Sequence, residues 1–186
     1  LVACGGGGNE NTGNSGSTGD ISNAEPSDTL TIAVSTDMTS MDPHVGKEIA
    51  AVVVTNNIFA TLLAKDENGE IIPYVAESWE QVSDTEWKFK IHEGVKFHDC
   101  TDCTASDVKF SLERAKTMPK AMSNASAIDH VSVDGDYEVT VHLSHPCPAF
   151  LYLLQDSSMK ILSEKAVTEA GDTYGEAPIG TGPFMF

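Results

Sequence analysis

Hydrophobic and polar residues alternate along several stretches of the chain, which predicts β-strands with one buried face. The clearest alternation places Trp87, Phe89 and Ile91 on one face of a strand that follows a turn at 83–86, and this strand and turn belong to a first predicted hairpin. Two further alternating stretches flank a Gly-containing turn at 134–136, which is the pattern of a hairpin. Strands are therefore expected at 30–34, 87–91, 127–133 and 137–143.

Hydrophobic residues at three- and four-residue spacing predict helices elsewhere. One helix is expected over 47–64, followed by an Asn-Gly turn at 66–70 between two extended pieces. Another should begin at Ala105, because Thr104 and Asp107 have the spacing of a capping box. Shorter helices are expected to begin near 149 and 163. The mixture of strands and helices predicts a mixed α/β fold class.

The first 28 residues differ in composition from the rest. Residues 5–28 are rich in Gly, Asn, Ser and Thr and have almost nothing to bury, so we expect a flexible tether. Before it, the start at 1–4 resembles the end of a bacterial lipoprotein signal peptide, where small residues precede a cysteine that becomes lipidated. Residues 1–4 are therefore interpreted as a lipobox remnant with Cys4 as the lipidation site, and the alternative is an ordinary thiol.

Charge and motif content narrow the function. The chain has 28 Asp and Glu against 11 Lys and Arg, a formal net charge of −17. This acidic excess, without a basic patch, argues against nucleic acid or an anionic membrane surface as partner. No H-E-x-x-H, G-x-S-x-G or Walker A motif occurs. The sequence therefore gives no pattern that predicts an enzyme, and none that predicts a cofactor or a resident metal.

Cys100 and Cys103 form a C-x-x-C motif, and Cys147 stands apart. Outside the cytoplasm such a pair is first interpreted as a disulfide, between Cys100 and Cys103 or from one of them to Cys147. Free thiols are the second interpretation. A zinc site that adds His98 and either His145 or Cys147 is the third, although a single C-x-x-C is a weak signal for metal.

Four motifs follow one another between residues 76 and 114: A-E-S-W at 76–79, W-K-F-K-I at 87–91, E-G-V-K-F-H-D at 93–99 and T-A-S-D-V-K-F-S-L-E-R at 104–114. Their order resembles that in family 5 of the bacterial extracytoplasmic solute-binding proteins, which serve peptide and nickel ABC transporters. One position departs from the family pattern, because Cys100 stands where Gly usually follows His-Asp. If that position has a positive φ, Cys is a poor substitute.

The resemblance implies a periplasmic-binding-protein-like fold of type II, cluster C. It also implies that the chain is an incomplete, N-terminal fragment of that fold. The implied divisions are the first strand of the main domain with a segment along the ligand cleft at 29–45, a small second domain at 46–177, and a return crossing to the main domain at 178–186.

The implied function is that of the substrate-binding component of an ABC importer. It would capture oligopeptides or dipeptides between two hinged lobes outside the cell membrane and deliver them to the permease. Such a protein would be a monomer that contacts the membrane through a lipid anchor. The residues expected to line the cleft or lie near its hinge are Met38, Thr39, Ser40, His44 and Thr181. The rival interpretation is a metal or haem scavenger of the nickel-binding type.

Overall fold

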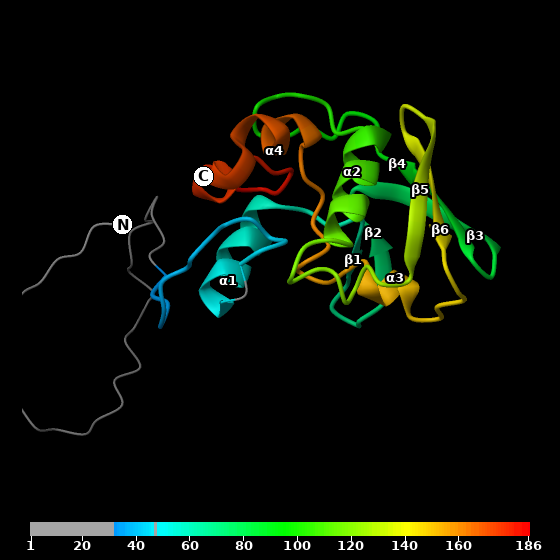
Figure 1. The fold of residues 1–186 in the computed structure, drawn as a ribbon, viewed down its shortest axis with the longest axis horizontal. Coiled ribbons are helices and arrows are strands. Elements are labelled where there is room, and N and C mark those ends of the chain that lie inside the picture. The colour runs from blue at the N-terminus through cyan, green and yellow to red at the C-terminus, as the bar shows by residue number, and fades with distance from the viewer. Residues whose placement is uncertain (1–31, 47) are drawn as a thin grey trace, which may run out of the picture. The chain divides into compact units, whose positions relative to one another are not determined.

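The computed structural model describes residues 32–46 and 48–186 (Figure 1). The predicted lipidation site Cys4, the predicted tether at 5–28 and the first part of the strand expected at 30–34 lie outside these residues. The chain divides into two units, Leu1–Ala33 and Val34–Phe186. All helices and strands of the described residues belong to the second unit.

Two hairpins build a four-stranded antiparallel sheet (Figure 1). β3 (Ala76–Ser83) and β4 (Glu86–Ile91) form the first hairpin, and β5 (Ile128–Gly135) and β6 (Glu138–Leu143) form the second. The hairpins join through the pairing of β4 with β6, which gives the order β3-β4-β6-β5. Both hairpins predicted from the alternating pattern are confirmed.

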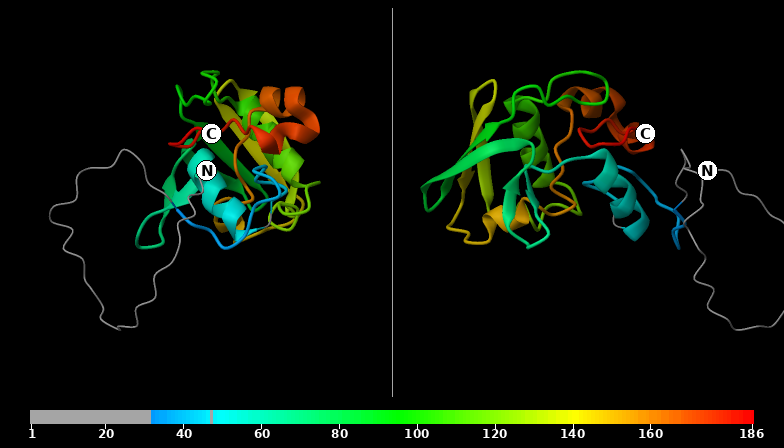
Figure 2. Two further views of the ribbon diagram at one scale, coloured as in Figure 1. Left: turned by 90° about the vertical axis from the view of Figure 1, so that its left-hand side faces the viewer. Right: turned by 180° about the vertical axis from the view of Figure 1, so that it is seen from behind.

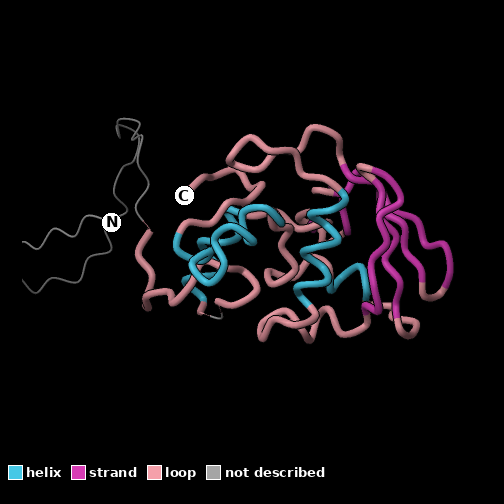
Figure 3. Tube along the Cα trace, turned by 45° about the horizontal axis from the view of Figure 1, so that its top comes forward, coloured by secondary structure: helices cyan, strands magenta, loops and turns pink. Residues whose placement is uncertain are grey.

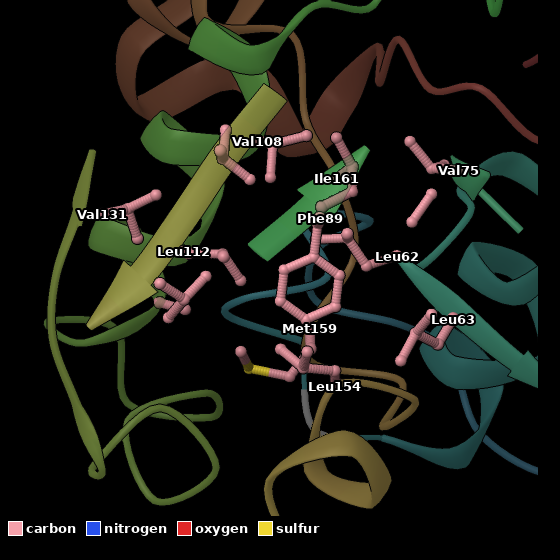
Figure 4. Close-up of a cluster of buried hydrophobic side chains, with 14 of the residues drawn as sticks. Leu62, Leu63, Val75, Phe89, Val108, Leu112, Val131, Leu154, Met159 and Ile161 are labelled. Carbon is pink, nitrogen blue, oxygen red and sulfur yellow. The ribbon is translucent and has the colours of Figure 1, made fainter. Parts of the chain in front are cut away.

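One face of this sheet packs against helix α2 (Ala105–Ala115). Phe89 on β4 pairs with Val139 on β6 and is completely buried, and Val108 and Leu112 on α2 are buried beside it (Figure 4). A fully buried side chain of this size stabilises the fold by about 1.5–3 kcal/mol relative to an exposed one. The core therefore lies between the sheet and α2, as the alternation around Phe89 predicts.

Helix α2 begins where the sequence predicts. The backbone N–H and the hydroxyl of Thr104 each donate to the Asp107 carboxylate at 3.0 Å. The bond from the Thr104 N–H is one half of the expected capping box, and in the other half the Thr104 side chain accepts from the Asp107 backbone N–H at the helix start.

Helix α1 (Ile49–Ile58) is shorter than the helix expected over 47–64. It ends because Phe59 is extended, with φ −120° and ψ 146°. The chain then forms β1 (Leu63–Lys65), which pairs with β2 (Ile71–Pro73) across the predicted turn. Periodicity failed here because a short, fully buried apolar run fits a helix and a strand equally well.

Helices α3 (Phe150–Leu153) and α4 (Glu164–Ala170) start near their expected positions. The 3-10 helix η2 (Gly171–Glu176) follows α4 and was not predicted. Ser163 caps α4 by accepting a hydrogen bond from the Ala166 N–H at 3.2 Å. Helices α1 and α4 lie on the side of α2 away from the four-stranded sheet (Figures 2 and 3). A second apolar cluster there contains Met41, Ile58, Phe59, Leu162, Ala166, Val167 and Tyr174.

The described part of the strand expected at 30–34 is not a strand. Residues 32–34 have no pairing partner in the described ranges, and Ile32 and Val34 are 60% and 47% exposed. An alternating pattern becomes a strand only where another strand accepts its backbone hydrogen bonds. Neither sheet extends to this stretch. Among the described helices, none combines the length and apolar character needed to cross a membrane.

Candidate functional site

The predicted ligand-binding residues before α1 lie on an irregular segment, 38–44. The Asp42 carbonyl accepts a hydrogen bond from the Gly46 N–H at 2.9 Å, which closes a turn. The Met41 N–H donates to the carbonyl of Gly175 in η2 at 3.0 Å. The segment is therefore held against the C-terminal part of the unit.

An ion pair fixes the same segment to α2. Arg114, which is the only arginine in the sequence, donates from Nη1 to Asp42 Oδ1 at 3.1 Å and from Nη2 to Asp42 Oδ2 at 2.6 Å. The two side chains are 16% and 7% exposed, respectively. This two-pronged geometry is the strongest arrangement of a guanidinium and a carboxylate. Removing either partner would leave a poorly solvated charge behind.

His44 is turned inward rather than toward a ligand. Its side chain has no exposed surface, and Nε2 donates to the Lys160 carbonyl at 3.3 Å. Nδ1 has no hydrogen-bond partner among the described residues. Burial, and then the nearby Arg114 charge, lower the pKa of His44 to about 4, so the ring is neutral at pH 7. His44 is therefore buried among the described residues, and its place in the ligand cleft stays a prediction.

Met38, Thr39 and Ser40 are more accessible. Met38 is half-buried against the second apolar cluster, and Thr39 is exposed with its hydroxyl donating to Glu48 Oε1 at 2.8 Å. Ser40 Oγ accepts from the Asp42 N–H at 3.1 Å. These three predicted residues therefore share one accessible stretch that offers an apolar side chain and two hydroxyls.

Two lysines near His44 were not found from the sequence. The Lys120 N–H donates to the His44 carbonyl at 3.4 Å, and the Lys120 ammonium is close enough to Asp42 and Glu48 for their charges to act on its pKa. Lys160 is only 7% exposed. Burial, together with the Lys120 charge, lowers the pKa of Lys160 to about 8. The signal in the sequence that could have identified Lys160 is its position, since it is a lysine within the apolar run around Ile161.

Thr181, the predicted hinge residue, lies apart in a backbone slot. The Gly182 N–H donates to the Ile58 carbonyl at the end of α1, at 2.7 Å. On the other side, His98 bonds to the backbone of Gly180 and Gly182. The Thr181 hydroxyl is buried between them and has no partner within the described part of the chain.

The loop with the cysteines has the strained position that the departure from the family motif suggested. Cys100 has φ 68°, so a side chain stands where the backbone favours glycine.

Cys100, Cys103 and Cys147 are free thiols, and the expected Cys100–Cys103 disulfide is not formed in this structure. Cys103 is buried in the core whereas Cys100 is exposed, and burial raises the pKa of Cys103 to about 12. In the described ranges no three His, Cys, Asp or Glu side chains could share a metal ion.

Comparison with known proteins gives consistent results. Residues 70–186 match the family model for bacterial extracellular solute-binding proteins, family 5 Middle. The glutathione-binding protein GsiB of Pectobacterium atrosepticum is 31% identical over 159 residues, which cover 83% of this chain and 31% of that protein.

Solved structures show the same fold. NikZ from Campylobacter jejuni in complex with Ni(L-His) superposes with a TM-score of 0.75 at 30% identity, covering 87% of this chain and 33% of that one. DppA from Helicobacter pylori in complex with the peptide STSA gives 0.70 at 29% identity, covering 81% and 35%. The chain thus spans about a third of the length of these proteins. It belongs to the bacterial extracellular solute-binding proteins of family 5 and has the fold of the periplasmic binding proteins.

Proposed function

We propose that this chain supplies part of a solute-binding protein that captures oligopeptides or dipeptides outside the cell membrane and delivers them to the permease of an ABC importer. The observation that carries the proposal is the family match over residues 70–186. Support for a peptide comes from the relatives, because one is a glutathione-binding protein and another binds the peptide STSA.

The accessible stretch at Met38, Thr39 and Ser40 is the proposed contribution to the ligand site. Its hydroxyls can hydrogen-bond to a peptide backbone, and Met38 offers a surface that adapts to different side chains. The half-buried Lys120 lies close by, with its N–H bonded to the His44 carbonyl. The carboxylate of a peptide-like solute could therefore meet a positive charge beside this stretch.

In the proposed architecture, 29–45 belongs to the main domain, 46–177 is the small second domain, and 178–186 returns to the main domain with Thr181 near the hinge. The ligand would be enclosed when hinged lobes close around it. The 186-residue chain by itself should then bind peptide weakly or not at all, because it spans only about a third of its relatives' length and the proposed enclosing surface needs both lobes. Isothermal titration of the chain with dipeptides and oligopeptides checks this, and micromolar affinity would contradict it.

A chimera tests the function itself. Residues 32–186 replace the matching part of the Pectobacterium atrosepticum glutathione-binding protein, and the chimera is titrated with glutathione, with dipeptides to pentapeptides and with Ni(L-His). We expect at least one peptide to bind, and Thr39→Ala to weaken that binding. Lys109→Ala, an exposed change on α2, is the matched control and should leave affinity unchanged. A folded chimera that binds no peptide and no glutathione would refute the proposal.

A nickel complex is the second candidate solute. The specific observation in its favour is the similarity to NikZ, whose structure contains Ni(L-His). Binding of Ni(L-His) by the chimera, without binding of any peptide, would select this alternative.

We also propose that the protein works as a monomer outside the cytoplasm, anchored through lipid on Cys4. The four residues before the predicted tether support this, and several acyl chains would be needed for stable anchoring. Mass spectrometry of the protein made with a complete signal peptide should show diacylglycerol on Cys4. An unmodified Cys4 thiol would exclude the anchor.

A further inference from the structure

His98 makes two side-chain hydrogen bonds to one short stretch of backbone far along the chain. Its Nε2 lies 2.9 Å from the Gly182 carbonyl oxygen, and the Gly180 N–H donates to its Nδ1 at 3.3 Å. A third bond runs from the His98 N–H to the Gly180 carbonyl at 3.0 Å. Because Nε2 must donate and Nδ1 must accept, these partners require the neutral tautomer with hydrogen on Nε2.

The other side of this stretch is held by α1. The Gly182 N–H donates to Ile58, and the Phe184 N–H donates to the Asn57 carbonyl at 3.1 Å. A Cβ on Gly180 would collide with the Ile58 carbonyl oxygen, and one on Gly182 would lie 2.5 Å from the Asn57 oxygen. The backbone is therefore confined between α1 and His98, in a slot that leaves no room for side chains at either glycine.

The loop that carries His98 is itself well anchored. Phe97 is 3% exposed in the main core, and its N–H donates to the Thr101 carbonyl at 2.9 Å. The Asp99 carboxylate accepts from the Thr101 N–H and hydroxyl at 3.1 and 2.6 Å. Cys100 adopts its positive φ in this same turn. The His98 imidazole therefore projects from a well-anchored loop, which a side chain that positions other groups requires.

We infer that His98 is a positioning residue, whose Nε2–H tautomer fixes the backbone at 180–182 and so sets the direction in which the chain leaves this domain. The inference rests on the proposed function, in which 178–186 is the crossing between lobes, because the exit direction there determines how the lobes approach each other. Residues 183–186 beyond the slot are exposed, and the bond from the Phe184 N–H to the Asn57 carbonyl ties them to α1.

Nuclear magnetic resonance on the 186-residue chain tests this without any solute. Long-range nitrogen spectra of the wild-type imidazole should show hydrogen on Nε2 and an acceptor at Nδ1 at pH 7. In His98→Ala, the Gly180 amide should exchange with solvent at least about tenfold faster, because it loses its acceptor. The Gly182 amide should keep its protection, because its acceptor is Ile58 rather than His98. Order parameters of residues 183–186 should fall in the same variant.

Two further variants make the result specific. His98→Asn should restore protection of the Gly180 amide, because an amide oxygen can replace Nδ1 as acceptor. His92→Ala, at an exposed histidine of the same loop, should change none of these readouts. An Nδ1–H tautomer in the wild type, or unchanged Gly180 exchange in His98→Ala, would overturn the inference. Since no solute is involved, such a failure is separate from failure of the chimera to bind peptide, which would refute the proposed function alone.

Discussion

Arg114→Ala is expected to release the 38–44 segment from α2. In the wild type, the Asp42 carboxylate accepts two hydrogen bonds from Arg114 and one from the His44 N–H at 2.9 Å. The variant leaves the carboxylate, which is 7% exposed, with only the backbone bond. Its burial is then no longer compensated by an opposite charge.

The magnitude follows from the exposure of the pair. Removing one partner of a fully buried ion pair costs about 3–5 kcal/mol. Arg114 is 16% exposed, so water partly screens the pair and the lower end, about 3 kcal/mol, is expected. For a unit of this size, that loss corresponds to a fall in Tm of about 6–12 °C.

Urea unfolding followed by circular dichroism and tryptophan fluorescence measures the effect. Lys109→Ala, on the exposed face of the same helix, is the control and should change stability by less than about 0.5 kcal/mol. A double-mutant cycle with Asp42→Asn separates the pairwise energy from other effects of each change. If Arg114→Ala unfolds within about 0.5 kcal/mol of the wild type, the pair does not hold the segment and the reasoning is wrong.

Three further predictions concern titration, strain and thiol chemistry. Burial lowers the pKa of His44 from 6.5 to about 4, so as pH falls the histidine is protonated in the unfolded chain before it is protonated in the folded one. The free energy of unfolding should therefore drop by up to about 3 kcal/mol between pH 6.5 and pH 4. Urea titrations at several pH values should show a smaller drop in His44→Gln, and an equal drop would contradict the assignment. Cys100→Gly should stabilise the protein by about 1 kcal/mol because it removes a side chain at positive φ, whereas Cys100→Ala should give no gain in the same urea assay. In the native protein a thiol reagent should label the exposed Cys100 and leave the buried Cys103 unlabelled, because the raised pKa of Cys103 disfavours its reactive thiolate. Rapid labelling of Cys103 would show that the core is open to the reagent.

Local sequence signals identified most of the secondary structure. Both hairpins and the start of α2 were predicted correctly, because a two-residue alternation or a cap involves residues close in sequence. The end of α1 was predicted incorrectly, since Phe59 and Leu63 are fully buried and their spacing suits a helix as well as a strand. A positive φ at Cys100 was also anticipated, from the glycine expected there.

The ligand-binding residues stay a prediction, and the structure shows only how accessible each of them is. Met38, Thr39 and Ser40 lie on an accessible stretch, but His44 is buried, and the spacing of residues could not tell inward from outward on an irregular segment. The Arg114–Asp42 ion pair was not predicted, because the two residues are 72 positions apart in the sequence. No pattern along the chain reports a contact at that separation.

By itself, the sequence determined the family, the hairpins and the capped helix, since each depends on motifs or periodicities within a few turns of backbone. Only the tertiary structure decided which charges are buried together, that Cys100 and Cys103 face different surroundings, and that His98 meets the backbone of Gly180 and Gly182. The physical reason is that burial and hydrogen-bond partners arise from packing between segments distant in the chain, and local patterns carry no record of that packing.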